Sequence, residues 1–150
     1  AMDGGHRGPV VDTSLRTSAD GVFAAGNVLH PVDTADVAAI DGRFVATQVR
    51  RYLDGGPSSW GGLRLTAQEP FVWVSPGVIT SPAVAPPRSR VLLWSHEFRA
   101  APVVEVRQGS TVLARRRLPW PVSPGRVFRV PWSLLGSARP DGDDVLIALG

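Results

Sequence analysis

The stretch "TSADGVFAAGNV", residues 17–28, combines a turn, an apolar run and a second break. Thr17 to Gly21 are turn-forming residues, Val22 to Ala25 are apolar, and Gly26-Asn27 end the run. The apolar run predicts a short strand over residues 22–25, and another strand is predicted over residues 8–12. Small residues at a strand end let the backbone approach a neighbouring group closely. The stretch therefore predicts either an ordinary strand with a tight exit or a loop shaped to hold a ligand.

A helix is predicted directly after this stretch, over residues 34–53. Its apolar residues recur at three- and four-residue spacings, which is the pattern of a helix with one buried face. Asp33 or Thr34 is the expected N-cap, and Asp36 adds the negative charge that favours a first turn. Gly42 costs the helix about 1 kcal/mol relative to alanine. It indicates either a close approach to a neighbouring backbone or ligand, or a tolerated glycine.

The rest of the chain predicts β-structure. Residues 55–62 are rich in glycine and serine and indicate a linker, after which short apolar runs alternate with proline and glycine. The predicted strands are residues 63–67, 71–74, 91–98, 103–107, 111–117, 127–130 and 145–149. Residues 108–110 predict a hairpin, and residues 132–136 predict one helical turn. The expected fold class is α+β, mostly β, with a segment over residues 1–54 followed by a small antiparallel β-sandwich over residues 63–150.

Composition restricts the class of protein. The chain has 150 residues, of which 43% are hydrophobic, enough for a packed core. All 16 basic residues are arginine, and the net charge is only +3, which is low for a nucleic-acid-binding domain. No apolar run approaches the ~18 residues that span a bilayer. There is no cysteine for a disulfide, a thiolate metal site or a redox dithiol. We therefore expect a cytoplasmic protein with no metal site, no nucleic-acid partner and no membrane partner.

Residues 11–28 resemble the C-terminal FAD motif of the pyridine nucleotide-disulfide oxidoreductase superfamily, which includes thioredoxin-reductase-like enzymes. The family pattern is Thr-Ser, two residues, Gly, Val or Ile, Phe or Tyr, Ala, a small residue, Gly and Asp, followed by a short loop and a helix. This chain has both parts in that order, and the resemblance covers about residues 8–54. It departs from the pattern at Asn27, where the family usually has Asp. An asparagine amide still accepts a hydrogen bond through its oxygen and donates through its nitrogen.

The resemblance implies where FAD would be contacted. In the family, the residue at the end of the strand bonds a ribityl hydroxyl, and the following helix points its N-terminus at the flavin pyrimidine. The implied cofactor-binding residues are Gly26, Asn27, Thr34, Ala35 and Asp36. A helix N-terminus offers unpaired N–H groups and the positive end of a dipole to the anionic part of a reduced flavin. Asp36 can alternatively be a capping charge only, and no catalytic residue is implied.

The same resemblance implies an FAD-dependent oxidoreductase that moves hydride between NAD(P)H and flavin. A complete enzyme of this kind needs a Gly-x-Gly-x-x-Gly turn after its first strand, and this chain has none. We therefore expect residues 1–54 to be the incomplete C-terminal segment of an FAD-binding domain. The missing parts would be N-terminal FAD and NAD(P) domains or a partner subunit, and this chain alone would be inactive.

A different interpretation is that the β-rich part is a non-catalytic interaction module and that residues 1–54 are a flavoprotein relic. Arg115, Arg116 and Arg117 alternate across a predicted strand. They fit a charged edge that prevents strand-to-strand aggregation, and they also fit a patch for phosphate or a protein partner. The five tryptophans are expected in the core or at the junction, and a carbohydrate-binding module is a third interpretation.

Overall fold

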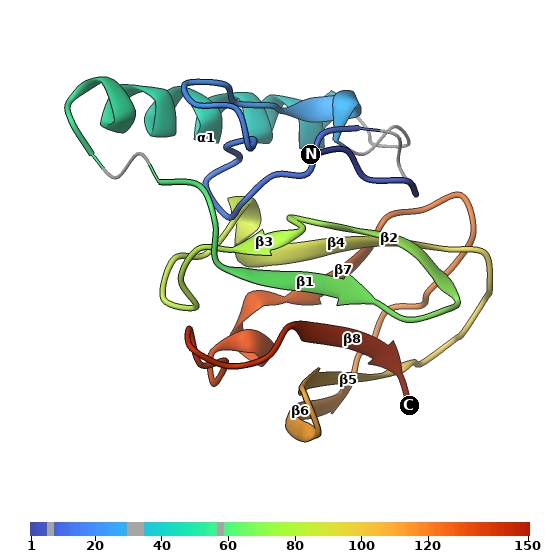
Figure 1. The fold of residues 1–150 in the computed structure, drawn as a ribbon. Helices are drawn as coiled ribbons and strands as arrows, with labels where there is room; N and C mark the ends of the chain where they lie inside the picture. The colour runs from blue at the N-terminus through green and yellow to red at the C-terminus, as the bar shows by residue number, and fades with distance from the viewer. Residues whose placement is uncertain (6–7, 30–34, 57–58) are drawn as a thin grey trace.

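The computed structural model describes residues 1–5, 8–29, 35–56 and 59–150. Figure 1 shows α1 (Ala35–Leu53) and the N-terminal segment on one side of the strands, with β6 and the C-terminus on the opposite side. The larger sheet has the order β3 (Val78–Ile79), β1 (Leu63–Ala67), β8 (Val145–Leu149), β5 (Val103–Gln108), β6 (Thr111–Arg117). The smaller sheet has the order β2 (Phe71–Ser75), β4 (Arg90–Ser95), β7 (Phe128–Pro131). Three short 3₁₀ helices complete the described structure: η1 (Gly26–Val28), η2 (Pro87–Ser89) and η3 (Trp132–Leu135).

The main core lies between the two sheets. In β1 alternate residues point inward, so that Leu63 and Leu65 are buried while Arg64 between them is exposed. The core residues contributed by the smaller sheet are Phe71, Val74, Val91, Leu93, Phe128 and Val130. Those contributed by the larger sheet are Leu63, Leu65, Ile79, Val104, Val106, Val145 and Ile147. Two packed sheets with one shared core give the sandwich that the turn-punctuated strands predicted.

The predicted strands of residues 63–150 are all present, with three differences. β4 ends at Ser95 rather than at residue 98, because the Ser95 hydroxyl accepts the Glu97 N–H at 3.0 Å and closes a turn. β3 was not predicted, since only two residues separate its flanking turns. The sheet is also not wholly antiparallel: β1 and β8 pair in parallel. Two parallel strands must be joined by a long connection, and here residues 68–144, which hold most of the other strands, join β1 to β8.

The N-terminal segment corrects the expected strands over residues 8–12 and 22–25. Neither forms a strand; the segment makes isolated bridges, such as Asp12 with Val78 and Arg16 with Phe23. Backbone bonds from Thr17 N–H to the Val22 carbonyl (2.9 Å) and from Ala24 N–H to the Leu15 carbonyl (3.0 Å) make a short irregular hairpin instead. Leu15 has φ +62°, which bends the chain where a regular ladder would continue.

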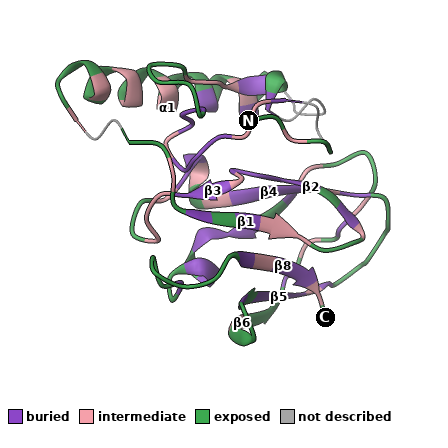
Figure 2. Cartoon of the chain, viewed as in Figure 1, coloured by how far each residue is buried: buried purple, intermediate pink, exposed green. Residues whose placement is uncertain are grey.

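α1 forms as predicted and packs one face against the smaller sheet. Val37 joins Trp73 and Leu92 in a second buried cluster. Beside it, the Asp41 carboxylate meets the guanidinium of Arg88 from η2 at 2.5 Å, with Asp41 fully buried. The opposite face of α1 is exposed, as the colouring in Figure 2 shows. The helix is therefore covered on one side by the rest of the described chain.

A connection without helix or strand follows α1, at residues 55, 56 and 59–62. It leads from the end of α1 at Leu53 to the start of β1 at Leu63. Within the described parts of the chain, no helix combines the length and the apolar character that crossing a membrane requires.

Candidate functional site

The hairpin of residues 12–24 is shaped by a buried ion pair. The Asp12 carboxylate is fully buried and accepts the backbone N–H groups of Ser14 (2.8 Å) and Arg16 (3.0 Å) through Oδ1. Its Oδ2 accepts Nε (2.9 Å) and Nη2 (2.8 Å) of the Arg16 guanidinium. A carboxylate with four N–H donors satisfies most of its acceptor sites, which compensates the cost of its burial. The Asp12 carboxylate thus holds the backbone that leads into the turn of residues 17–21, the TSADG turn, without the hydrogen bonds of a sheet.

The TSADG turn is tied to the far end of α1. Thr17 Oγ1 accepts the Ala19 N–H at 3.2 Å, and Gly21 takes φ +71°, a conformation that favours glycine. The Tyr52 hydroxyl donates to Asp20 Oδ1 at 3.2 Å, and its ring meets Phe23 edge to face at 6.0 Å. This hydrogen bond, together with the negative charge of Asp20, raises the pKa of the Tyr52 phenol above 10.0. These two contacts of Tyr52 therefore hold the TSADG turn against the C-terminal end of α1.

The Gly26-Asn27 break is a 3₁₀ turn against the beginning of α1. Gly26 is buried at φ +71°, and a Cβ at this position would lie 3.4 Å from the Cβ of Ala38. The Leu29 N–H closes the turn onto the Gly26 carbonyl at 2.8 Å, and the Leu29 side chain is fully buried. Asn27 between them is exposed. A glycine conformation and a close helix contact therefore present the Asn27 side chain at the surface.

The implied cofactor-binding residues are placed as follows. Gly26 packs on α1 at Ala38, about one turn beyond the first helical residue. Asn27, Ala35 and Asp36 are all exposed. Thr34, together with the alternative N-cap Asp33, lies outside the described residues. The structure thus brings η1 and the first turns of α1 together.

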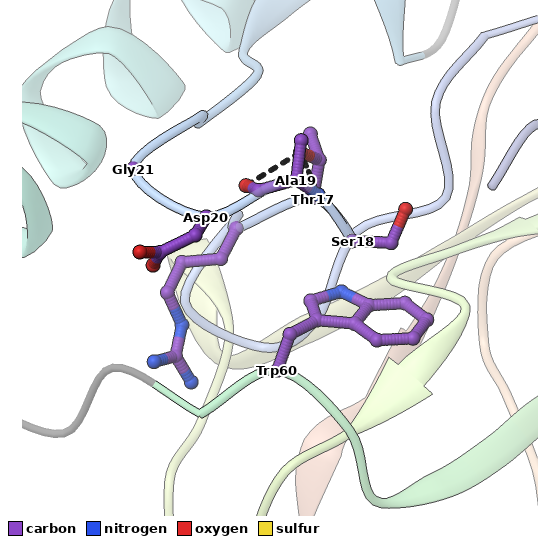
Figure 3. Close-up of a pocket in the computed structure, with 7 residues that line it drawn as sticks. Thr17, Ser18, Ala19, Asp20, Gly21 and Trp60 are labelled. Atoms are coloured by element: carbon purple, nitrogen blue, oxygen red, sulfur yellow. Dashed lines mark hydrogen bonds between the residues drawn. The ribbon is translucent and has the colours of Figure 1, made fainter.

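A cavity of about 350 Å³ lies elsewhere in the same segment. It is lined by residues 16–21 and Trp60 from the connection after α1; neither Gly26 nor Asn27 contributes. In Figure 3 the indole of Trp60 lies beside Ser18, while the Thr17–Ala19 hydrogen bonds hold the turn above it. A planar group or a polyol can stack on the face of an indole, and the neighbouring hydroxyl and backbone groups can form hydrogen bonds with it. The sequence placed Trp60 in the core or at the junction; the glycine- and serine-rich residues around it were the signal that its side chain is accessible.

Comparison of the chain with protein-family models, with curated proteins and with solved structures finds no match.

Proposed function

We propose that this chain is the C-terminal portion of an FAD-dependent NAD(P)H oxidoreductase and contributes flavin contacts through residues 17–28 and the start of α1. The observation that supports this best is the geometry at Gly26 and Asn27. A positive-φ glycine packed on the helix turns the chain so that a polar side chain is exposed beside the first turns of α1. The resemblance implies small residues, a polar side chain and a following helix start in this order.

The chemistry of these residues fits a flavin. The Asn27 amide can accept from or donate to a ribityl hydroxyl. Ala35 is small and exposed, so a ring system can approach the first turn of α1 closely, where the helix dipole favours negative charge. Asp36 is also exposed in that turn and serves in this proposal as a charge that stabilises the helix start. FAD, when bound, supplies the hydride chemistry, and the protein supplies its position and electrostatic surroundings.

The exposed face of α1 supports the proposal that residues 1–54 belong to a larger FAD-binding domain. Ala35, Ala39, Gly42 and Ala46 lie at spacings of four and three residues on one stripe, and all four are exposed. A Cβ on Gly42 would have no neighbour within 4 Å among the described residues, so no contact with these residues explains the glycine. Small residues allow a helix to pack closely on a sheet. In the proposed enzyme, the stripe packs on the sheet of the FAD-binding domain.

The proposal is tested with Asn27 in the chain joined to its natural upstream sequence. Asn27→Leu should lower flavin retention after gel filtration, because leucine has no hydrogen-bonding group. Asn27→Asp, which restores the residue usual in the family, should retain flavin as the unchanged protein does. Equal retention in Asn27→Leu and the unchanged protein, at equal thermal stability, would show that Asn27 is a turn residue only.

The alternative function is a non-catalytic β-sandwich interaction module. The observation in its favour is the arginine-rich, exposed edge at β6. The two functions are distinguished by flavin: a stable complex with a partner in which neither chain carries flavin supports the module. The two also separate by variant, since changes in β6 should leave flavin retention unaffected.

A further inference from the structure

β6 is an open edge of the larger sheet. Among the described residues it pairs only with β5, and it stands last in the strand order. Leu113 and Ala114 pack against the core, whereas Arg115, Arg116 and Arg117 beyond them are all exposed. Figure 2 shows β6 at the side of the molecule remote from α1. The open edge is therefore clear of the candidate flavin site.

The direction of the backbone groups along β6 follows from its register. Leu118 N–H donates to the Pro102 carbonyl at 2.9 Å, so the backbone of Leu118 points towards β5. In an antiparallel strand the backbone groups of successive residues point to opposite sides. Arg116, paired with Val104, therefore also points towards β5, while the N–H and C=O groups of Arg115 and Arg117 point away from the sheet. No partner for these outward groups occurs among the described residues.

The charge at this edge is positive and only partly compensated. Glu105 on β5 is the one side-chain carboxylate that forms an ion pair with these strands among the described residues; it pairs with Arg107, and its Oε2 lies 3.7 Å from Arg115 Nε. Arg117 donates to the Ala101 carbonyl at 3.0 Å and forms no ion pair with the residues that the structure describes. Arg116 is exposed and faces the other side of the strand. Both sides of one edge strand thus carry positive charge next to open hydrogen-bonding groups.

We infer that β6 binds an extended acidic segment of a partner protein by strand addition. The partner strand pairs its backbone with Arg115 and Arg117, and the aspartate or glutamate side chains on one of its faces lie beside these two arginines. Backbone pairing supplies affinity, and the alternating side chains supply specificity. This inference concerns the sandwich alone and stands apart from the flavin proposal.

The positive charge of β6 favours an acidic strand over a second copy of β6 as its binding partner. A second copy of β6 would place arginine rows opposite each other, and like charges on neighbouring strands are destabilising. Arginine at an edge therefore excludes self-pairing while still admitting a strand of opposite charge. A nucleic acid matches the charge but leaves the outward N–H and C=O groups of Arg115 and Arg117 without strand partners.

The test is amide hydrogen exchange by NMR on the full chain with a synthetic peptide that alternates valine with glutamate. At a peptide concentration about ten times Kd, the Arg115 and Arg117 amides should exchange about tenfold more slowly. The Arg116 amide, already bonded to β5, serves as the internal control and should change little. A peptide with lysine in place of glutamate should give no protection.

Two variants separate backbone pairing from charge. Arg115→Pro removes an outward N–H without a ladder bond to β5, a position where a strand tolerates proline, and should abolish peptide binding. Arg115→Ala keeps the N–H and should weaken binding by only several-fold. Absence of protection at Arg115 and Arg117 with the acidic peptide would overturn the inference, as would equal protection by the lysine peptide. Tighter binding of an oligothymidylate probe without amide protection would also overturn it. The exchange pattern of the unchanged chain gives this answer even if the proline variant does not fold.

Discussion

The Asp41–Arg88 pair should hold α1 on the sandwich, and its removal is the most informative perturbation of the fold. The carboxylate is fully buried, and the guanidinium side chain is 15% exposed. Arg88 Nη1 also lies 3.4 Å from the Val37 carbonyl, so one guanidinium touches two turns of the helix. The pair thus joins two segments that lie 47 residues apart in the chain.

The expected magnitude follows from burial. Two unit charges ~4 Å apart attract by about 4 kcal/mol at an effective dielectric constant near 20. The cost of removing both ions from water is of the same order, so the intact pair adds little net stability. Breaking it leaves one charge buried without compensation, which costs about 3–5 kcal/mol. A domain of this kind has about 5–15 kcal/mol in total, so Asp41→Asn should remove a large part of it.

The assay is urea unfolding of Asp41→Asn, Arg88→Met and the double variant. Each single variant should lose about 3–5 kcal/mol, and the double variant should lose less than their sum. Asp54→Asn is the matched control at the C-terminal end of the same helix: Asp54, directly after α1, forms an exposed pair with Arg50 at 3.8 Å, and the loss of this pair should cost less than about 1 kcal/mol. Strict additivity of the two single variants, or equal effects of Asp41→Asn and Asp54→Asn, would refute this reasoning.

Three further predictions concern single positions. The raised pKa of Tyr52, the chain's one tyrosine, means that the stability from its bond to Asp20 is present below pH 10 and lost as pH rises through the folded-state pKa. Tyrosinate absorbance should show Asp20→Asn moving that pKa down towards 10.0. Gly62→Ala should cost more than Gly61→Ala in thermal unfolding; both have φ near +139°, a strain worth about 1–3 kcal/mol, but only at Gly62 would a Cβ overlap a backbone carbonyl. Gly42→Ala should stabilise the isolated chain by about 1 kcal/mol and destabilise the longer protein in which the α1 stripe is covered; stabilisation in both would contradict that packing.

Local patterns predicted the regular elements well. The helix over residues 34–53 and the strands over residues 63–67 and 145–149 follow from periodicity and flanking turns, which are properties of neighbouring residues. The parallel pairing of β1 with β8 did not follow, because it depends on which distant strand lies alongside. The expected strand over residues 22–25 failed for a related reason. The buried carboxylate of Asp12 accepts the N–H groups of Ser14 and Arg16, in the segment opposite residues 22–25, so these two groups do not join a sheet ladder.

The sequence predicted which residues belong to the candidate site, but not how they are arranged in space. The sequence indicated a strand that exits at Gly26 and Asn27 before a helix; the exit is a 3₁₀ turn against α1 instead, and the strand before it does not form. Trp60 was not predicted to border a cavity, because its neighbours across the cavity are residues 16–21, far away in sequence. The Asp41–Arg88 pair was missed as well, since charged residues are normally expected on the surface.

The central claim is that this chain completes a flavin site together with preceding sequence. Its most direct test is the visible flavin absorbance of two purified proteins: this chain alone, and the chain joined to its natural upstream sequence. We expect stoichiometric flavin in the longer protein and very little in the chain alone. A correctly folded longer protein that carries no flavin, even after incubation with FAD, would contradict the claim.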